Sequence, residues 1–467
     1  MKNILSIFCL LALTISFAGC GCGLDFGTPA PFNIKHYLAV PNQEVVVYST
    51  QRYNAEQDAP ALFKTSFTNG KTEKLAEGEI VDFIVTASGE YVYFFTTLSS
   101  ASATGSELYR KSLVSQDPVE TIHILDANGQ PILFYTNNFL HINYLLTADA
   151  MVIRDGSIVY FTVVDDHVDD FTFYKIGSFI HEEMFVNSQA EELYWLKDSN
   201  QLYKTSFQNF VPQLVKQLPE SASNYGLNKQ SNLLVYENLD RQALFSIHLQ
   251  TGQIQKIFDV STLGDDFELI DHWEVNPELD LVAASVVGQK KGIVLINLNN
   301  NAKNIFTLNS IDGSNEYLFL EHSSDGEFLF VFEGDLTAKQ LSDLQSDPDL
   351  VETTHVQLHV FYDLTTPNPK KFSTSDLGEE PSVSSSRLAF DLAQNKAYYA
   401  IYQDLFQLDL IGFSQNSIFH RSAGVHSVKL AGDHLLANTS DGAFLSSGEI
   451  LFAIDIDSQT SFQITAD

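Results

Sequence analysis

Short apolar runs separated by polar turns recur along nearly the whole chain. Residues 62–67 (LFKTSF) return at 202–207 as LYKTSF, with only an aromatic exchange. Looser copies with a leading Leu or Ile start at 108, 244, 293, 358, 405 and 451, and a weaker one starts at Phe171. Successive starts of the eight strong copies differ by 46, 94, 42, 49, 65, 47 and 46 residues, and 94 is two periods. A period in the mid-forties is typical of four-stranded propeller blades.

A second pattern lies upstream of several copies: a polar turn with Asp-Gly or a similar pair, followed by a β-rich run. It occurs at residues 87–90 (ASGE), 154–157 (RDGS) and 324–327 (SDGE). Many copies of the first pattern are in turn followed by a short turn and another strand-like run, as at Thr251-Gly252-Gln253. Two extended runs across such a turn predict a hairpin. Each period therefore predicts four strands.

These repeats predict an all-β chain that folds as a single β-propeller of four-stranded blades. The 35 Phe and 19 Tyr supply large side chains to fill the space between blades. Radial closure also protects strand edges, which an open sheet of some thirty strands could not do. Eight blades are favoured. Seven is the alternative, because the 31 residues from Phe171 to Leu202 are too few for a complete extra blade.

The order of strands and turns resembles the WD40-like repeats of TolB-type propellers, over about residues 35 to 467. A regular Trp before each turn is lacking, since the chain has only Trp195 and Trp273. The resemblance therefore implies the architecture, and the TolB function is not carried over. Two long intervals predict insertions near 124–145 and 333–354, with a short helix over 336–344 in the second. Insertions in repeats map to loops on one face, often the binding face.

The N-terminus predicts export. Lys2 precedes an apolar run over residues 4–17, which is too short to cross a bilayer and is typical of a secretory signal. Ala18-Gly19-Cys20 then resembles the lipobox of bacterial lipoproteins, which implies that Cys20 is lipidated and becomes the first mature residue. Gly21, rather than Asp, favours the outer membrane under the sorting rule of enteric bacteria. The predicted segments are a signal peptide (1–19), a lipidated N-terminus and tether (20–34) and the propeller (35–467).

Composition narrows the partners. Removal of residues 1–19 takes away Lys2, so the mature net charge is −33 − 1 = −34. So acidic a chain repels nucleic-acid phosphates and anionic headgroups, which excludes DNA and RNA and leaves acyl chains on Cys20 as the membrane attachment. The charge itself is expected to serve solubility. Cys9 leaves with the signal and Cys22 lies beside the anchor, so the propeller contains no cysteine pair and no disulfide framework.

Catalytic motifs are absent from the sequence. It has no Gly-x-Ser-x-Gly, His-Glu-x-x-His, Cys-x-x-Cys or Gly-x-x-x-x-Gly-Lys pattern, and no Asp-box turn of the sialidase kind. One local cluster could supply oxygen ligands for Ca²⁺, against the alternative of a solvated hairpin tip; its members are Asp165, Asp166, His167, Asp169 and Asp170. His181-Glu182-Glu183 is a smaller candidate set. We expect neither a catalytic residue nor a resident cofactor.

Three functions remain open. The first is a lipid-anchored scaffold of the bacterial cell envelope that binds an envelope protein and is not an enzyme. The second is a propeller enzyme, or a small-ligand or cation binder, with a site at the mouth of the central channel, where loops from several blades converge without leaving a contiguous motif. The third is a structural surface protein whose acidic shell resists aggregation.

Overall fold

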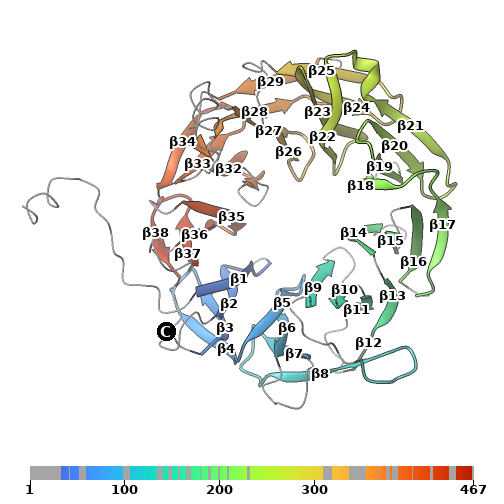
Figure 1. The fold of residues 1–467 in the computed structure, drawn as a ribbon. Coiled ribbons are helices and arrows are strands. Elements are labelled where there is room, and N and C mark those ends of the chain that lie inside the picture. The colour runs from blue at the N-terminus through green and yellow to red at the C-terminus, as the bar shows by residue number, and fades with distance from the viewer. Residues whose placement is uncertain are drawn as a thin grey trace, which may run out of the picture.

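The structure is a computed structural model. It describes residues 33–464 apart from 42, 52–58, 98–105, 133, 135–139, 146–149, 156–157, 165–169, 179, 188–190, 198–199, 208–209, 229–231, 309–317, 336–353, 367, 375–378, 381–387, 402, 421–423 and 441–448. The described residues form nine antiparallel sheets arranged as a closed ring (Figure 1). In each sheet the first strand lies nearest the ring axis and the fourth lies outermost.

The strands follow one another blade by blade. Blades 1 to 3 consist of β1 (Asn33–Ala39), β2 (Val45–Gln51), β3 (Ala61–Ser66) and β4 (Thr72–Glu77); β5 (Ile80–Val85), β6 (Tyr91–Thr97), β7 (Ser106–Ser112) and β8 (Glu120–Leu125); and β9 (Leu140–Leu145), β10 (Ala150–Asp155), β11 (Ile158–Val163) and β13 (Tyr174–Ser178). Blades 4 to 6 consist of β14 (Ile180–Asn187), β15 (Glu192–Lys197), β16 (Gln201–Ser206) and β17 (Gln213–Gln217); β18 (Ala222–Asn228), β19 (Leu233–Asn238), β20 (Ala243–His248) and β21 (Ile254–Asp259); and β22 (Phe267–Val275), β23 (Leu281–Gly288), β24 (Lys291–Asn297) and β25 (Lys303–Leu308).

Blades 7 to 9 consist of β26 (Leu318–His322), β27 (Leu329–Asp335), β28 (Thr354–Tyr362) and β29 (Lys370–Ser373); β31 (Leu388–Asp391), β32 (Lys396–Ile401), β33 (Asp404–Asp409) and β34 (Gln415–His420); and β35 (Val425–Ala431), β36 (His434–Ser440), β37 (Glu449–Asp455) and β38 (Ser461–Gln463). Two short strands are additional: β12 (Asp170–Thr172) extends blade 2, and β30 (Glu379–Glu380) pairs with β28. One 3-10 helix, η1 (Val260–Leu263), is the only helical element in the part of the chain that the structure describes.

The prediction of an all-β propeller with four-stranded blades is confirmed, but both predicted blade numbers are wrong: the ring has nine blades. All eight strong sequence copies are third strands of their blades. The weak copy at Phe171 is not, because residues 170–172 form β12 and the third strand of blade 3 is β11. Counted from Ile158, the third strands of blades 2, 3 and 4 are 158 − 108 = 50 and 202 − 158 = 44 residues apart, which leaves room for a whole blade.

The error has a local cause. The turns at 87–90 and 324–327 join the first and second strands of their blades, whereas the similar turn at 154–157 joins the second and third strands, β10 and β11. One turn sequence therefore serves two places in the fold. Only the pairing of the strands distinguishes them.

The core consists of apolar clusters between adjacent blades. Second strands read as nearly continuous buried runs, as in β19, where residues 234–238 are all buried. A sheet covered on both faces requires this pattern, whereas one-sided burial would give alternation. The largest buried side chains include Trp195, Tyr48 and Tyr236. Aromatic residues thus fill the wedges between blades, as the composition predicted.

The ring closes without exchange of strands. Blade 1 is built wholly from the first four strands and blade 9 from the last four. Across this seam the hydroxyl groups of Tyr37 and Ser427 lie 2.6 Å apart, and the rings of Phe67 and His434 stack at 5.0 Å between centroids. Tyr48 and Leu451 belong to the apolar cluster that spans the seam. Side-chain packing, rather than a shared sheet, therefore joins the ends of the ring among the described residues.

The glycine of the recurring turn has a structural role. Gln43 Nε2 of blade 1 donates to the Gly89 carbonyl of blade 2 (2.9 Å), and Asn276 Nδ2 of blade 6 donates to the Gly326 carbonyl of blade 7 (2.8 Å). Both glycines have positive φ, 72° in each case. The turn therefore brings its backbone against the preceding blade, where a side chain would not fit.

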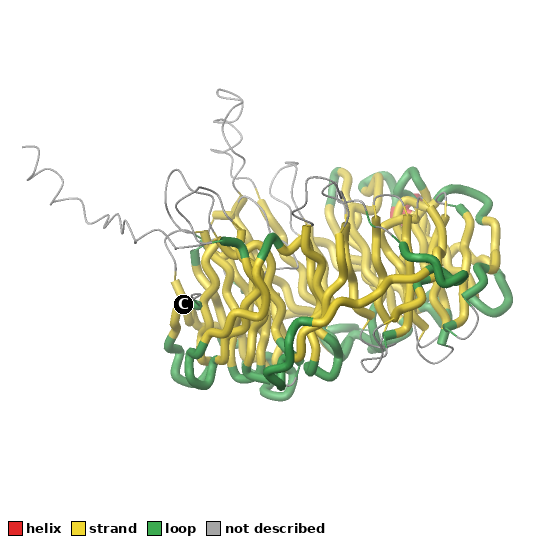
Figure 2. The backbone as a smooth tube through the Cα atoms, turned by 90° about the horizontal axis from the view of Figure 1, so that it is seen from below, coloured by secondary structure: helices red, strands yellow, loops and turns green. Residues whose placement is uncertain are grey.

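The two faces of the ring carry different kinds of connection (Figure 2). Turns between first and second and between third and fourth strands lie on one face, here named the hairpin face. Links between second and third strands and between blades lie on the other, here named the connection face, because antiparallel neighbours alternate in direction. Every run of eight or more residues between the strands listed above leaves from the connection face: 52–60, 98–105, 126–139, 309–317, 336–353 and 441–448.

Candidate functional site

Titratable side chains occur on the innermost strands of several blades. On the described inner strands they include Lys35, His36, Asp82, Asp271, His272, Glu274, Glu321, His322, His426 and Lys429. Most belong to two groups, one on blades 6 and 7 and one where blades 9, 1 and 2 meet. The inner edge is where a ligand at the centre of a propeller would be met.

In the first group, Glu274 links blades 6 and 7. Its Oε2 accepts a hydrogen bond from the backbone N–H of His322 at 2.8 Å. Asn276 Nδ2 lies 3.1 Å from His322 Nδ1. Glu321 Oε2 and His322 Nε2 are buried and have no hydrogen-bond partner among the described residues. This inner edge therefore holds two carboxyl groups and one imidazole in a largely desolvated place.

Burial dominates the electrostatics of these groups. It raises the pKa of Glu274 to about 8, a rise that the nearby Glu321 reinforces and the His322 N–H opposes. Burial also raises the pKa of Glu321 to about 7 and lowers that of His322 to about 4. The charged form is disfavoured in each case because it loses hydration. At neutral pH the site consequently presents neutral imidazole and largely protonated carboxylic acid, which can donate a hydrogen bond or a proton.

The second group surrounds His36 on β1. Burial lowers the pKa of His36; Asp82 opposes this, and Lys429 and Lys35 add to it. Burial likewise lowers the pKa of Lys429, whose Nζ lies 4.7 Å from the ring centroid of Tyr37. Asp82 Oδ2 accepts from the backbone N–H of Ile142 at 3.1 Å, the same inter-blade bond that Glu274 makes. These acids therefore also fasten one inner strand to the next.

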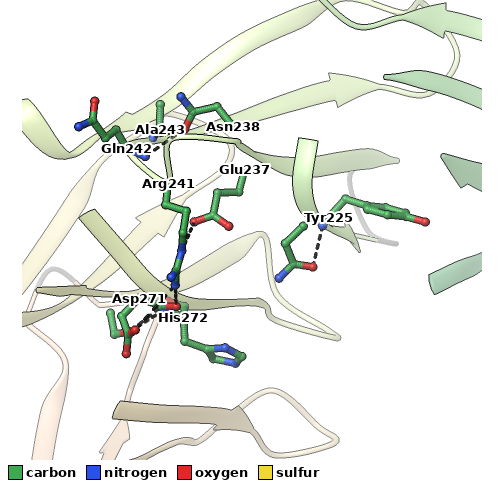
Figure 3. A network of polar contacts seen from close by, with 10 residues as sticks. Tyr225, Glu237, Asn238, Arg241, Gln242, Ala243, Asp271 and His272 are labelled. Atoms are coloured by element: carbon green, nitrogen blue, oxygen red, sulfur yellow. Dashed lines mark hydrogen bonds and ion pairs between the residues drawn. The ribbon is translucent and has the colours of Figure 1, made fainter. Parts of the chain in front are cut away.

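Figure 3 shows a polar network between blades 5 and 6. Arg241, in the β19–β20 turn at φ 56°, reaches from blade 5 to Asp271 on β22 and donates to its backbone carbonyl. Its Nε lies 3.7 Å from Oε1 of the buried Glu237, and its Nη2 lies 3.7 Å from Asp271 Oδ1. The neighbouring His272 has its pKa lowered by burial, with Asp271 opposing and Arg241 adding to the shift. The network joins two blades through one guanidinium.

A buried relay crosses the outer strands of blade 7. Ser373 Oγ lies 2.8 Å from His359 Nδ1, and His359 Nε2 lies 2.7 Å from Glu333 Oε2. Both the imidazole and the carboxylate are almost fully buried. The three residues lie on adjacent paired strands, β27, β28 and β29. They satisfy one another inside the sheet and so account for polar residues at core positions.

The predicted site residues fall mainly outside the described part of the chain. Cys20 lies there, as do Asp165, Asp166, His167 and Asp169. Asp170 is exposed at the start of β12. The described residues contain no group of three or more His, Cys, Asp or Glu side chains arranged to hold a metal ion. The side chains of His181-Glu182-Glu183 also lie outside the described set.

The two predicted insertions have different outcomes. Residues 124–145 contain the end of β8, a turn, and the inner strand β9 of blade 3, so much of this segment belongs to the ring itself. The second insertion extends β27 to Asp335 and resumes at Thr354 in β28. The predicted helix over 336–344 lies outside the described residues. Across that same described part, no helix is long and apolar enough to cross a membrane.

Sequence reasoning missed the paired inner-strand acids Glu274 and Glu321. A signal for them exists: each is an acidic residue within an otherwise apolar strand-like run that precedes a turn. Their unusual pKa values could not be found in this way. Those values depend on burial by neighbouring blades.

Comparisons with known proteins concern the fold. No family model matches the chain, and no curated protein matches it. Among solved structures, the C-terminal WD40 domain of Sif2 is 12% identical, with 84% of this chain and 96% of that chain covered and a TM-score of 0.43. Saccharomyces cerevisiae Sqt1 is 10% identical, with 83% and 86% covered and a TM-score of 0.43. An oligogalacturonate lyase in complex with manganese is 12% identical, with 80% and 97% covered and a TM-score of 0.41. These weak likenesses carry no argument about function.

Proposed function

We propose that this protein is a lipid-anchored propeller of the bacterial cell envelope that binds a protein partner and is not an enzyme. Acyl chains on Cys20 would hold it at the membrane, with the outer membrane favoured by Gly21. A TolB-type relationship belongs to the same proposal. It rests on the repeat pattern alone.

The unequal length of the connections at the two faces is the observation that carries the proposal. The hairpin face has runs of at most seven residues, whereas the connection face has runs of up to 18 residues between strands. Long loops on a rigid ring supply variable side chains for recognition, while the blades hold their ends in place. The run 336–353 is the longest and is the preferred contact segment.

The experiment is a pull-down of the full-length protein from native membranes, read by mass spectrometry, beside a Cys20→Ala form. Strands β27 and β28 stay paired up to Asp335 and His355, so a short Gly-containing turn can replace 336–353 without disturbing the blade. The same replacement of 441–448, between the paired Ser440 and Glu449, is the matched control. We expect a stoichiometric envelope partner that is retained by the control and lost when 336–353 is replaced.

Two results would contradict this proposal. The first is absence of any partner from membranes shown to contain the anchored protein. The second is a partner retained equally by both loop variants, which would remove 336–353 as the contact segment. Recovery of Cys20→Ala in the membrane fraction would argue separately against the lipid anchor.

The paired acids favour a second candidate, a propeller enzyme or small-ligand binder at the inner edge. A ligand bound through the protonated Glu321 should stabilise the protein more at pH 6 than at pH 8.5, since the pKa of Glu321 is about 7. Thermal-shift screening of a metabolite library at both pH values tests this. We expect the pH difference of a true hit to vanish in Glu321→Gln. A screen without such a hit rejects the candidate.

A further inference from the structure

Blade 3 departs from the regular blade at its outer edge. After β11 the chain leaves its own sheet, and residues 170–172 add as a parallel fifth strand to β8 of blade 2. The backbone N–H of Phe173 donates to the Leu125 carbonyl at 2.7 Å, and Thr162 Oγ1 donates to the Thr172 carbonyl at 2.9 Å. The chain then returns to blade 3 as β13. This crossing segment, residues 170–173, is named the strap (Figure 1).

A cavity of about 560 Å³ lies beside the strap on the outer wall of the ring. Four aromatic residues from two blades line it: Tyr160, Phe173 and Tyr174 of blade 3 and Phe210 of the β16–β17 turn of blade 4. The rings of Tyr174 and Phe210 stack with centroids 3.9 Å apart and planes 12° from parallel. The volume falls within the range of small-molecule sites, which are mostly apolar with a few placed polar groups.

The polar lining residues restrict the ligand. Asp126 and Lys175 line the same cavity, so their opposite charges offset one another toward any ligand that spans it. The turn after β8 fixes Asp126: its Oδ1 accepts from the backbone N–H groups of Asn128 and Gln130, each at 2.8 Å. A purely apolar ligand would desolvate these charged groups without giving them hydrogen bonds, at a cost in free energy. A singly charged ligand would be repelled by one of them.

We propose that this cavity binds a short neutral oligosaccharide. A pyranose ring presents C–H groups on its faces, which pack against the negative faces of aromatic rings. Its hydroxyl groups both donate and accept, so they can serve the Asp126 carboxylate, the Asn128 amide and the Lys175 ammonium together. The proposal is independent of the protein-binding function, because the cavity is lined by the outer wall and not by the segment 336–353.

The test is isothermal titration calorimetry of the full-length protein in a detergent without a sugar headgroup. The probes are maltohexaose, cellohexaose and N-acetylchitohexaose. We expect one of them to give a saturable isotherm. Tyr174→Ala and Phe210→Ala should each weaken its affinity about tenfold or more, since aromatic packing of this kind contributes roughly 0.5–1.5 kcal/mol beyond area burial. Tyr174→Phe should retain most of the affinity, because the stacking face remains.

Phe413→Ala is the matched control. Phe413 occupies the corresponding β33–β34 turn of blade 8 and packs on Tyr362 and Phe372, with centroids 5.0 and 4.9 Å away. It should leave the affinity unchanged, and circular dichroism should show that all variants are folded. The proposal is overturned if the folded wild-type protein binds none of the three probes, or if Phe413→Ala weakens binding as much as Phe210→Ala.

Discussion

Gly326→Ala is expected to lower the free energy of unfolding by about 4 kcal/mol. Gly326 has φ 72°, a conformation that costs a residue with a Cβ roughly 1–2 kcal/mol. An added Cβ would also lie 2.2 Å from Oδ1 of the fully buried Asn276. To relieve this overlap the amide must move. It would then strain its bonds to the Glu278 and Leu279 N–H groups and to the Gly326 carbonyl, each contributing about 1 kcal/mol.

Gly129→Ala provides the matched control for the backbone term alone. Gly129 has φ 76°, and a Cβ added there meets nothing within 4 Å. Its substitution should cost only about 1–2 kcal/mol. Urea unfolding at one pH, with unchanged m-values, measures both variants. Equal losses for Gly326→Ala and Gly129→Ala would show that the contact between blades 6 and 7 does not constrain the turn.

Glu274→Gln is expected to remove a loss of stability at alkaline pH. The folded-state pKa of Glu274, about 8, lies above its ordinary value of 4.5. Between these values the folded state binds more protons than the unfolded state, so the free energy of unfolding falls as pH rises through the window. Gln resembles the protonated acid and can still accept the hydrogen bond from the His322 N–H. The variant should therefore gain about 2 kcal/mol on wild type between pH 6.5 and pH 8, at 1.36 kcal/mol per pH unit.

The window above pH 6.5 is chosen because His322 acts in the opposite direction below it. Its pKa is lowered from 6.5 to about 4, so the unfolded state binds the extra proton and stability rises with pH over that interval. Urea unfolding across pH 6.5–8 is the measurement, with the exposed Glu327→Gln as the control. Parallel pH profiles for wild type and Glu274→Gln would show that Glu274 is not held protonated.

Local pattern predicted the strands well. Each of the eight strong copies, such as 62–67 and 202–207, is a third strand, because an apolar run bounded by polar turns pairs with similar runs nearby. The hairpins around Gly89 and Gly326 were predicted for the same reason. The blade number was not, because the turn at 154–157 resembles those two and yet joins the second and third strands of its blade.

The sequence by itself determined the fold class, the four-stranded repeat and the absence of the catalytic motifs sought. These depend on period and composition, which are properties of short segments. Tertiary structure alone decided that there are nine blades, that β12 crosses to blade 2, and that the seam closes by side-chain packing. It also decided the raised pKa values of Glu274 and Glu321, residues 47 positions apart in the sequence. Burial and strand pairing involve segments distant along the chain, so their effects appear only when the ring has formed.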